Sequence, residues 1–310
     1  MQLTETTETR QKMNHTLTKI ITMGAVLASI AYTDADDKKP RASIVKSCDK
    51  ITIDGKLTEK SWKQANEYGI DWTVGGKKSG NLSEKKYGAV KYTWDANYLY
   101  VAYRVFDENI VNLPSKEFQG PLGNRRQGLR KYDKNVELDY VSLFISLDDD
   151  HFLWEIDHNA SNCVNDVCFW LPSPGMKIFE SSIADKNKVI EQKSTYLEDQ
   201  HEVDWDTGKE KSFTFKTAVT LMEGSTIAKD DKKKNHDKGY VAEMRIPWFS
   251  LGMARSRKKG FDFDVHGQVI RLLILVRNGE SSDTYHASHK LKPGLVHLQM
   301  SNWQKFTLRK

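Results

Sequence analysis

Residues 90–106 read VKYTWDANYLYVAYRVF, and this stretch decides the fold class. Its two halves, residues 90–94 and 98–106, are rich in aromatic and β-branched side chains, and Asp95-Ala-Asn97 separates them. Two such runs around a short turn that contains Asp and Asn predict a β-hairpin. The second run is partly apolar on both of its alternating faces, which is typical of a strand in the centre of a sheet.

Similar runs recur along the chain, and helical periodicity is confined to short pieces at residues 57–65 and 247–251. The further predicted strands are residues 140–147, 152–156, 167–171, 212–221, 239–246, 269–276 and 303–308. Many strands with hardly any helix predict an all-β protein, an antiparallel β-sandwich of jelly-roll type with long loops and short helical turns. No Pro/Ser-rich linker divides the chain, so we expect residues 44–310 to form a single domain.

Composition excludes several classes of protein. The chain has 310 residues with 12 Tyr, 12 Phe and 8 Trp, which predicts a packed core. A net charge of +5 is too weak over this length to indicate nucleic-acid binding. Three Cys exclude a disulfide-dense scaffold and a four-Cys zinc site. No apolar run reaches the roughly 18 to 20 residues of a membrane span, so we expect no integral membrane protein.

The first 35 residues have the layout of a targeting segment. A short basic stretch from Met13 to Lys19 precedes a dozen mostly apolar residues, Ile20 to Ala31, and small residues follow. This order predicts a signal peptide that begins at Met13, with cleavage near Ala31 or Ala35. We therefore expect a secreted or periplasmic protein in which residues 1–35 are an N-terminal extension and signal peptide. A buried helix is the alternative explanation of this segment.

Export would permit disulfide bonds. Cys163 and Cys168 lie five residues apart, and both a bridge across a tight turn and two buried thiols fit that spacing.

Four segments, in order, resemble the family 9 carbohydrate-binding modules and their relatives. They are residues 53–62 with Ala65, residues 90–107, residues 139–145, and residues 215–219 with 239–243 and 246–251. The resemblance extends over about residues 44–310 and implies an antiparallel β-sandwich, often with bound calcium and without catalytic machinery. In the sugar-binding members two Trp rings sandwich a terminal sugar, while a Glu, an Arg and amides bond its hydroxyls. Ring faces cover the apolar C–H patch of a sugar, and polar groups fix its orientation.

The sequence departs from that sugar pocket at every aligned position. The two stacking Trp align with Val136 and His297, the Glu with Ser142, the Arg with Glu155, and an amide with Leu275. Either this chain binds sugar through other residues, or it binds something else.

Residues 154–166 are the preferred candidate site, because they are dense in hydrogen-bonding groups directly after a predicted strand. We expect Glu155, Asp157 and Asn159 to bind carbohydrate, with Trp170 as a stacking ring and His297 as a further contact. Asn and Asp also favour turns, so simple turn formation is the alternative. Trp205 and Trp303 are further stacking candidates or core residues.

A possible calcium site is suggested by Asp148, Asp149 and Asp150, which place three carboxylates on one predicted turn. The resemblance adds Asp54, Asp95 and Asp107 as further possible ligands. His286, His289 and His297 suggest a metal less strongly, because their spacing is not diagnostic outside a helix.

The function that follows is a secreted, non-catalytic carbohydrate-binding protein, which takes part in polysaccharide recognition or catabolism beside glycoside hydrolases. Glu155 and Asp157 lie on one strand face, but no catalytic motif supports an enzyme. Two alternatives stay open. One is a haem-b electron-transfer module like the related dehydrogenase subunits, and the other is a structural module that binds protein. Candidate haem ligands are Met176, Met222, Met244, Met253 and Met300.

Overall fold

The computed structural model describes the following parts of the chain: residues 42–73, 87–112, 138–147, 152–170, 191–193, 200–203, 210–213, 215–228, 236–248, 251, 265–278, 284–286 and 303–310. Contacts between residues divide the chain into two compact units, Met1–Pro40 and Arg41–Lys310. All described residues belong to the second unit. The predicted signal peptide lies outside the described residues. No helix among the described residues has both the length and the apolar character to cross a membrane.

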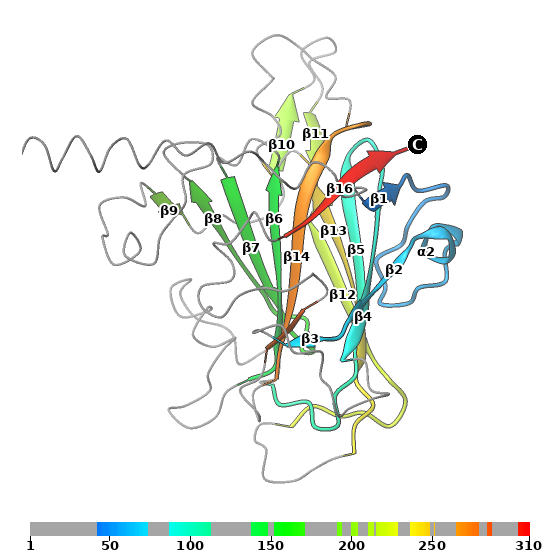
Figure 1. The fold of residues 1–310 in the computed structure, drawn as a ribbon, viewed down its shortest axis with the longest axis vertical. Coiled ribbons are helices and arrows are strands. Elements are labelled where there is room, and N and C mark those ends of the chain that lie inside the picture. The colour runs from blue at the N-terminus through cyan, green and yellow to red at the C-terminus, as the bar shows by residue number, and fades with distance from the viewer. Residues whose placement is uncertain are drawn as a thin grey trace, which may run out of the picture. The chain divides into compact units, whose positions relative to one another are not determined.

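The second unit is built from two large sheets (Figure 1), as the sequence predicted. The five-stranded sheet is antiparallel throughout, and its strands in spatial order are β12 (Lys216–Leu221), β13 (Tyr240–Pro247), β5 (Tyr98–Val105), β4 (Gly88–Trp94) and β2 (Glu67–Ile70). Strand β5 lies in the middle of this order, as expected from its two apolar faces. Its hairpin partner is β4, and the Asp95 carboxylate holds their turn by accepting hydrogen bonds from the Asn97 and Tyr98 amides, both at 2.8 Å.

The second sheet has nine strands. Its main path is β1 (Ala42–Val45), β16 (Gln304–Arg309), β14 (Val269–Arg277), β6 (Tyr140–Leu147), β7 (Phe152–His158), β8 (Val164–Trp170) and β9 (Glu191–Lys193). Off this path, β15 (Thr284–His286) pairs with β14 and with β3 (Trp72–Thr73). Its strand pairs are antiparallel except that of β1 with β16, which is parallel. A separate two-stranded sheet joins β10 (Gln200–Val203) and β11 (Glu210–Phe213).

One predicted strand was wrong in its extent. Residues 212–221 are not continuous, because β11 ends at Phe213 and pairs with β10, while β12 begins at Lys216 and pairs with β13. The predicted helix at residues 57–65 shortens to α2 (Lys60–Gln64).

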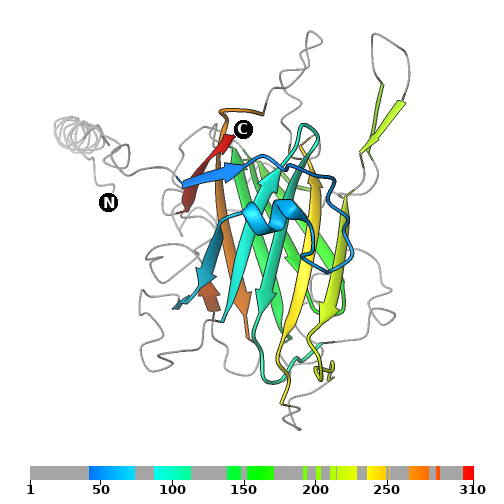
Figure 2. The same ribbon diagram turned by 90° about the vertical axis from the view of Figure 1, so that its right-hand side faces the viewer.

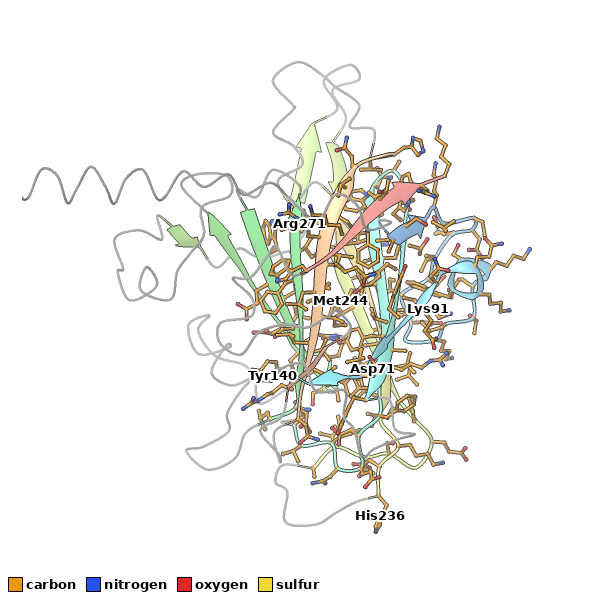
Figure 3. The ribbon with its side chains drawn as sticks, viewed as in Figure 1. Asp71, Lys91, Tyr140, His236, Met244 and Arg271 are labelled. Atoms are coloured by element: carbon orange, nitrogen blue, oxygen red, sulfur yellow. The ribbon has the colours of Figure 1, made fainter. Side chains whose placement is uncertain are left out.

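The core lies between the two large sheets. Alternate residues of β5 and β4 point inward, among them Val101, Tyr103 and Val90, and meet inward residues of β6 such as Leu143 and Ile145 in one buried cluster. Met244 on β13 also lies in this cluster, and Figure 3 labels it near the middle of the domain. Most of the hydrophobic stabilisation is therefore expected from this interface between the sheets.

A third layer covers the other face of the five-stranded sheet. Residues 47–66, which include α2, run across that face (Figure 2). Ile51, Ile53 and Trp62 form a second buried cluster with Tyr100 and Ala102 of β5. Because this layer occupies the sheet, that region of the outer surface is closed to a ligand.

Glu243 on β13 ties the third layer to the sheet. Its carboxylate accepts hydrogen bonds from the backbone amides of Asp54 and Gly55, at 3.0 and 2.7 Å, and from Trp62 Nε1 at 2.8 Å. Burial raises the pKa of Glu243, and these three hydrogen bonds oppose the shift. Residues 53–62 and 239–243, two of the segments that carry the family resemblance, are thus joined by direct contacts. This part of the resemblance therefore reflects the packing of the fold.

Strand β1 joins the two sheets at one corner. Trp94 Nε1 donates to the carbonyl oxygens of Ile44 at 3.1 Å and Arg309 at 3.2 Å, and Thr93 Oγ1 donates to Val45 at 2.7 Å. Trp94 is therefore a packing residue whose indole N–H links a strand of one sheet to two strands of the other.

Candidate functional site

The candidate site lies on the outer face of the nine-stranded sheet, which we define as the face turned away from the five-stranded sheet. On β6, Val141, Leu143 and Ile145 point into the core, so Ser142 and Phe144 point outward. On β7, Trp154 and Ile156 point inward in the same way, which places Glu155 and Asp157 outward.

Three strands bring outward residues into one row. Ser142 is paired directly with Asp157 of β7 on one side and with Leu275 of β14 on the other. Ser142 Oγ donates a hydrogen bond to Asp157 Oδ1. The next outward row contains Glu155, Phe144 and Leu273. Positions that are more than a hundred residues apart in the sequence therefore meet on this face.

Aromatic and cationic groups complete the outer face. The ring centroids of Phe144 and Trp303 are 5.7 Å apart, with their planes tilted by 49°. Arg271 of β14 pairs with Ser146 of β6, one row beyond Phe144. Figure 3 shows Arg271 and Tyr140 toward opposite ends of the nine-stranded sheet. The face thus combines two carboxylates, a guanidinium, hydroxyls and two rings.

These side chains have little access to solvent. Asp157 is 0 % exposed, Glu155 3 %, Trp303 3 % and Arg271 8 %. These side chains are therefore covered by other parts of the chain, and a ligand would contact them only where that cover opens.

Asn159 holds the turn after β7. Its side-chain Oδ1 accepts hydrogen bonds from the backbone amides of Ser161 and Cys163, both at 3.1 Å. Its backbone amide donates to the Cys163 carbonyl at 3.3 Å. The Asn159 Nδ2 and Ser161 Oγ atoms are buried and have no hydrogen-bond partner among the residues that the structure describes. The turn-forming role expected of Asn is thus present. Cys163 is partly buried, and the side chain of Cys168 lies outside the described part of the structure, so a bridge between them stays a prediction.

His158 is a buried polar residue that the sequence did not single out. It lies on the inward face of β7, is 0 % exposed, and accepts or donates hydrogen bonds through both ring nitrogens. Its Nδ1 is 2.5 Å from Tyr103 Oη, and its Nε2 is 2.9 Å from Asn162 Oδ1. Burial lowers the pKa of His158 from 6.5 to about 4, so the ring is neutral at pH 7.

The loop carboxylates that the family resemblance suggested as calcium ligands all bond to nearby groups. Asp107 accepts from the Asn109 amide at 2.9 Å, and Asp54 accepts from the Lys56 amide at 2.9 Å. Asp95 accepts from its own turn and from Tyr100 Oη at 2.7 Å. Two further buried carboxylates, Asp139 and Asp237, accept backbone amides at 2.6 to 2.9 Å. Within the described ranges, no group of three or more His, Cys, Asp or Glu residues is arranged to hold a metal ion.

Several predicted site residues fall where the structure gives no account of them. Asp148, Asp149, Asp150 and His297 lie outside the described residues, so the calcium site there stays a prediction. Trp170 ends β8, but its side chain is not described.

Two of the haem-ligand candidates are described. Met244 is fully buried between the sheets and Met222 is partly buried, while Met176, Met253 and Met300 lie outside the described residues.

Comparison with known proteins agrees with this description of the fold. A protein from Bacteroides uniformis ATCC 8492, provisionally described as carbohydrate-binding, has a similar structure with a TM-score of 0.51. The two sequences are 9% identical, and the match covers 86% of this chain and 98% of that one. This likeness concerns the fold alone.

Two structures of a family 9 carbohydrate-binding module from Caldicellulosiruptor kristjanssonii also match, each at 14% identity. The complex with cellotriose has a TM-score of 0.48 and covers 87% of this chain and 94% of that one. The complex with glucose has a TM-score of 0.42 and covers 86% and 95%.

A comparison with curated protein sequences found no match. Among family models, one described as "Carbohydrate family 9 binding domain-like" matches residues 53–119. That segment runs from the turn at Asp54-Gly55 through the β4–β5 hairpin, so it includes the first two segments of the predicted resemblance. Residues 53–119 are therefore confirmed as similar to the carbohydrate family 9 binding domain-like proteins, within a β-sandwich.

Proposed function

We propose that the protein binds a saccharide, without catalysing a reaction on it, at the outer face of the nine-stranded sheet. The main support for the proposal is that three positions that align with the sugar pocket of the family lie close together on this face. Ser142, Glu155 and Leu275 align with sugar-binding positions of the family and lie in two adjacent rows of one sheet face. The family match over residues 53–119 supports the same ligand class.

The chemistry of this face suits a sugar although the individual residues differ from the family pattern. Where the family has a Glu on β6, this chain has Ser142, and a carboxylate stands directly opposite at Asp157. Where the family has an Arg on β7, this chain has Glu155, and Arg271 of β14 supplies a guanidinium on the same face. An acid and an arginine are thus both present on this face, at positions other than those of the family.

Each group has a definite role in this proposal. Carboxylate and guanidinium groups form charge-assisted hydrogen bonds with sugar hydroxyls, which are stronger than neutral ones. The Phe144 and Trp303 rings offer apolar surface for the C–H patch of a pyranose. We assign Asn159, Trp170 and His297 to the edge of the site as further contacts, and calcium at Asp148, Asp149 and Asp150 as a structural ion.

Affinity electrophoresis on gels that contain plant or algal polysaccharides tests the proposal, followed by calorimetry with cello-oligosaccharides. Asp157→Asn keeps an acceptor for Ser142 and should weaken binding by about 10- to 100-fold, because a charge-assisted bond contributes about 1.5 to 3 kcal/mol. Glu155→Gln should act in the same direction. Glu223→Gln, an exposed residue beyond β12, is the matched control and should bind like the unmodified protein.

Two results would contradict the proposal. One is no retardation on any polysaccharide, and the other is equal binding by the Asp157→Asn, Glu155→Gln and Glu223→Gln variants. Release of reducing sugar by the purified protein would contradict the non-catalytic part alone.

We further propose that the protein acts outside the cytoplasm, beside glycoside hydrolases that degrade the same polysaccharide. The basic and then apolar order of residues 13–35 supports export. The intact mass of the exported protein measures this directly, and we expect a chain that begins after Ala31 or Ala35. A full-length chain confined to the cytoplasm would contradict it.

A further inference from the structure

The layer that covers the five-stranded sheet ends part of the way along β5. Tyr100 and Ala102 point outward beneath this layer and are 5 % and 0 % exposed. Further along the strand, Arg104 is only partly buried and Phe106 is 45 % exposed. Figure 2 shows α2 and the chain around it across the upper part of the sheet, while β5 continues below them. The lower end of this outer face is therefore open to solvent.

Phe106 stands on the open part of this face. Val105 points into the core, so Arg104 and Phe106 on either side of it point outward. The Phe106 amide continues the pairing with β4 by donating to the Tyr87 carbonyl at 2.9 Å. On its other side lies Gly239, where an added Cβ would be 3.0 Å from the Phe106 Cα. Because a glycine has no side chain, it leaves that side of the ring uncovered.

Arg104 lies at the centre of the open face without a counter-charge. Its direct partners in the sheet are Ala89 of β4 and Val241 of β13, which are both uncharged. The ion pair found among the described residues joins Lys91 to Glu67 at 3.8 Å and does not include Arg104. The guanidinium is therefore positioned to pair with an anion that comes from outside the chain.

A carboxylate lies at the edge of the same face. Gly69 of β2 is the partner of Ala89, and Ala89 is the partner of Arg104. The Cγ atom of Asp71 is 3.8 Å from the point where a Gly69 Cβ would stand. Since neighbouring strands are about 4.8 Å apart, Gly69 and Arg104 are about 10 Å apart. The guanidinium and the carboxylate therefore lie at different points of one shallow surface.

This arrangement suits a sugar chain that lies across the strands. The Cα atoms of Arg104 and Phe106 are two residues apart, which is about 7 Å in a strand. One sugar residue can therefore cover the Phe106 ring with its C–H patch while a carboxylate on it reaches the guanidinium. Arg pairs well with a carboxylate because its planar fork can form two parallel hydrogen bonds.

We propose that this face is a second saccharide site, specific for an acidic polysaccharide that contains uronate groups. Phe106 stacks on one sugar residue, Arg104 pairs with its carboxylate, and Asp71 accepts hydroxyls of a residue further along the chain. Charge complementarity favours this ligand, since Arg104 lacks an anion among its direct partners and the whole chain has a net charge of +5. The site lies on the other sheet from the one proposed above and does not depend on it.

Polygalacturonate and its methyl ester are matched probes for this site, because they share a backbone and differ in charge. We expect affinity electrophoresis of the full chain to show stronger retention on polygalacturonate than on the ester. Added salt should reduce this difference, since it screens an exposed ion pair. Equal retention on the two polymers, or no retention on polygalacturonate, would overturn the proposal.

Three variants test the assigned residues. Arg104→Gln should weaken binding to polygalacturonate by about 5- to 10-fold and leave binding to the ester unchanged. Phe106→Ala should weaken binding to both polymers by about 3- to 10-fold. Lys50→Gln removes the same charge from an exposed position in the third layer and should bind like the unmodified protein. Equal losses in Arg104→Gln and Lys50→Gln would show general charge attraction and would overturn the site.

Hydroxyl-radical footprinting gives a measurement on the unmodified protein. The Phe106 ring is exposed, so bound oligogalacturonate should lower its rate of oxidation severalfold. Cys48, which is exposed in the third layer, should keep its rate. An unchanged rate at Phe106 under saturating oligogalacturonate would contradict the proposal.

The same gels separate this site from the one on the nine-stranded sheet. Asp157→Asn should keep its retention on polygalacturonate. Retention lost in Asp157→Asn but kept in Arg104→Gln would assign the acidic polymer to the other sheet and overturn this proposal. Failure of every neutral polysaccharide to retain the protein would reject the proposed function alone.

Sedimentation velocity tests a protein occupant of the face. We expect Phe106→Ala and the unmodified protein to have the same oligomeric state. A dimer that Phe106→Ala dissociates would assign the face to a second copy of the chain and would overturn the saccharide site.

Discussion

The carboxylate of Glu243 shows how one residue can hold a layer in place. It accepts three hydrogen bonds from the segment that covers the five-stranded sheet, and its side chain is fully buried. The Gly55 amide and Trp62 Nε1 would otherwise be buried N–H groups without a partner, which is costly.

Replacement of Glu243 by Gln should therefore destabilise the protein by about 2 to 3 kcal/mol, because an amide N–H₂ would face donors. The free energy of unfolding in urea measures this. Glu223→Gln, on the exposed turn after β12, should change it by less than about 0.5 kcal/mol. Equal effects of the two substitutions would show that the three bonds do not contribute.

Gly239 is required by a close approach of backbone. A Cβ atom there would lie 1.8 Å from the carbonyl oxygen of Val105, and its φ is +115°. Gly224 also has a positive φ, +83°, but has no atom within 4 Å of its Cβ position.

These two glycines form a matched pair. Gly224→Ala should cost only backbone strain, about 1 kcal/mol. Gly239→Ala adds a collision with the neighbouring strand and should cost more than about 3 kcal/mol. Denaturant midpoints of the two variants give the comparison, and a similar loss in both would contradict it.

At the scale of the elements, two buried tryptophans differ in one respect. Trp94 on β4 donates from Nε1 to carbonyls of β1 and β16. Trp154 Nε1 on β7 is buried and has no acceptor within the described part of the chain. Both indoles pack in the main core.

Substitution of each by Phe should separate packing from hydrogen bonding. Trp94→Phe leaves two strand carbonyls without that donor, while Trp154→Phe removes an unsatisfied polar atom. We expect the Trp94 variant to lose about 1 to 3 kcal/mol more than the Trp154 variant in chemical denaturation. The reverse order would mean that β1 does not depend on this bond.

The elements that the sequence predicted well are those with strong local patterns. The hairpin of residues 90–106 has its turn signal and both apolar runs in adjacent sequence, so β4 and β5 could be recognised. Short strands such as β1 and β15 have four and three residues and carry little pattern of their own. Residues 212–221 have the strand propensity of one continuous strand, but β11 pairs with β10 and β12 pairs with β13. Strand propensity carries no information about which strand a segment pairs with.

The candidate site was predictable in part for the same reason. Alternation along β7 placed Glu155 and Asp157 on one face, which the structure bears out. Their deep burial depends on packing that alternation does not describe. The role of His158 depends on Tyr103, 55 residues earlier in the chain, and nothing local indicates that contact.

At the scale of the whole molecule, the chain separates into two units with the described fold entirely in the second. A protein that begins at Arg41 should therefore fold by itself. We expect its denaturation midpoint and its strand-dominated circular dichroism spectrum to match those of the full chain. A lower midpoint or loss of the strand signal would show that the first 40 residues are needed for stability.

The position of β16 sets the order in which the protein can be completed. This last strand lies between β1, the first described strand, and β14. Strand β1 therefore has no strand partner in this sheet, and one edge of β14 stays unpaired along residues 269–272, until residues 304–309 are in place. The larger sheet is thus completed only when residues 304–309 join it, and contacts between segments so distant in the sequence form slowly.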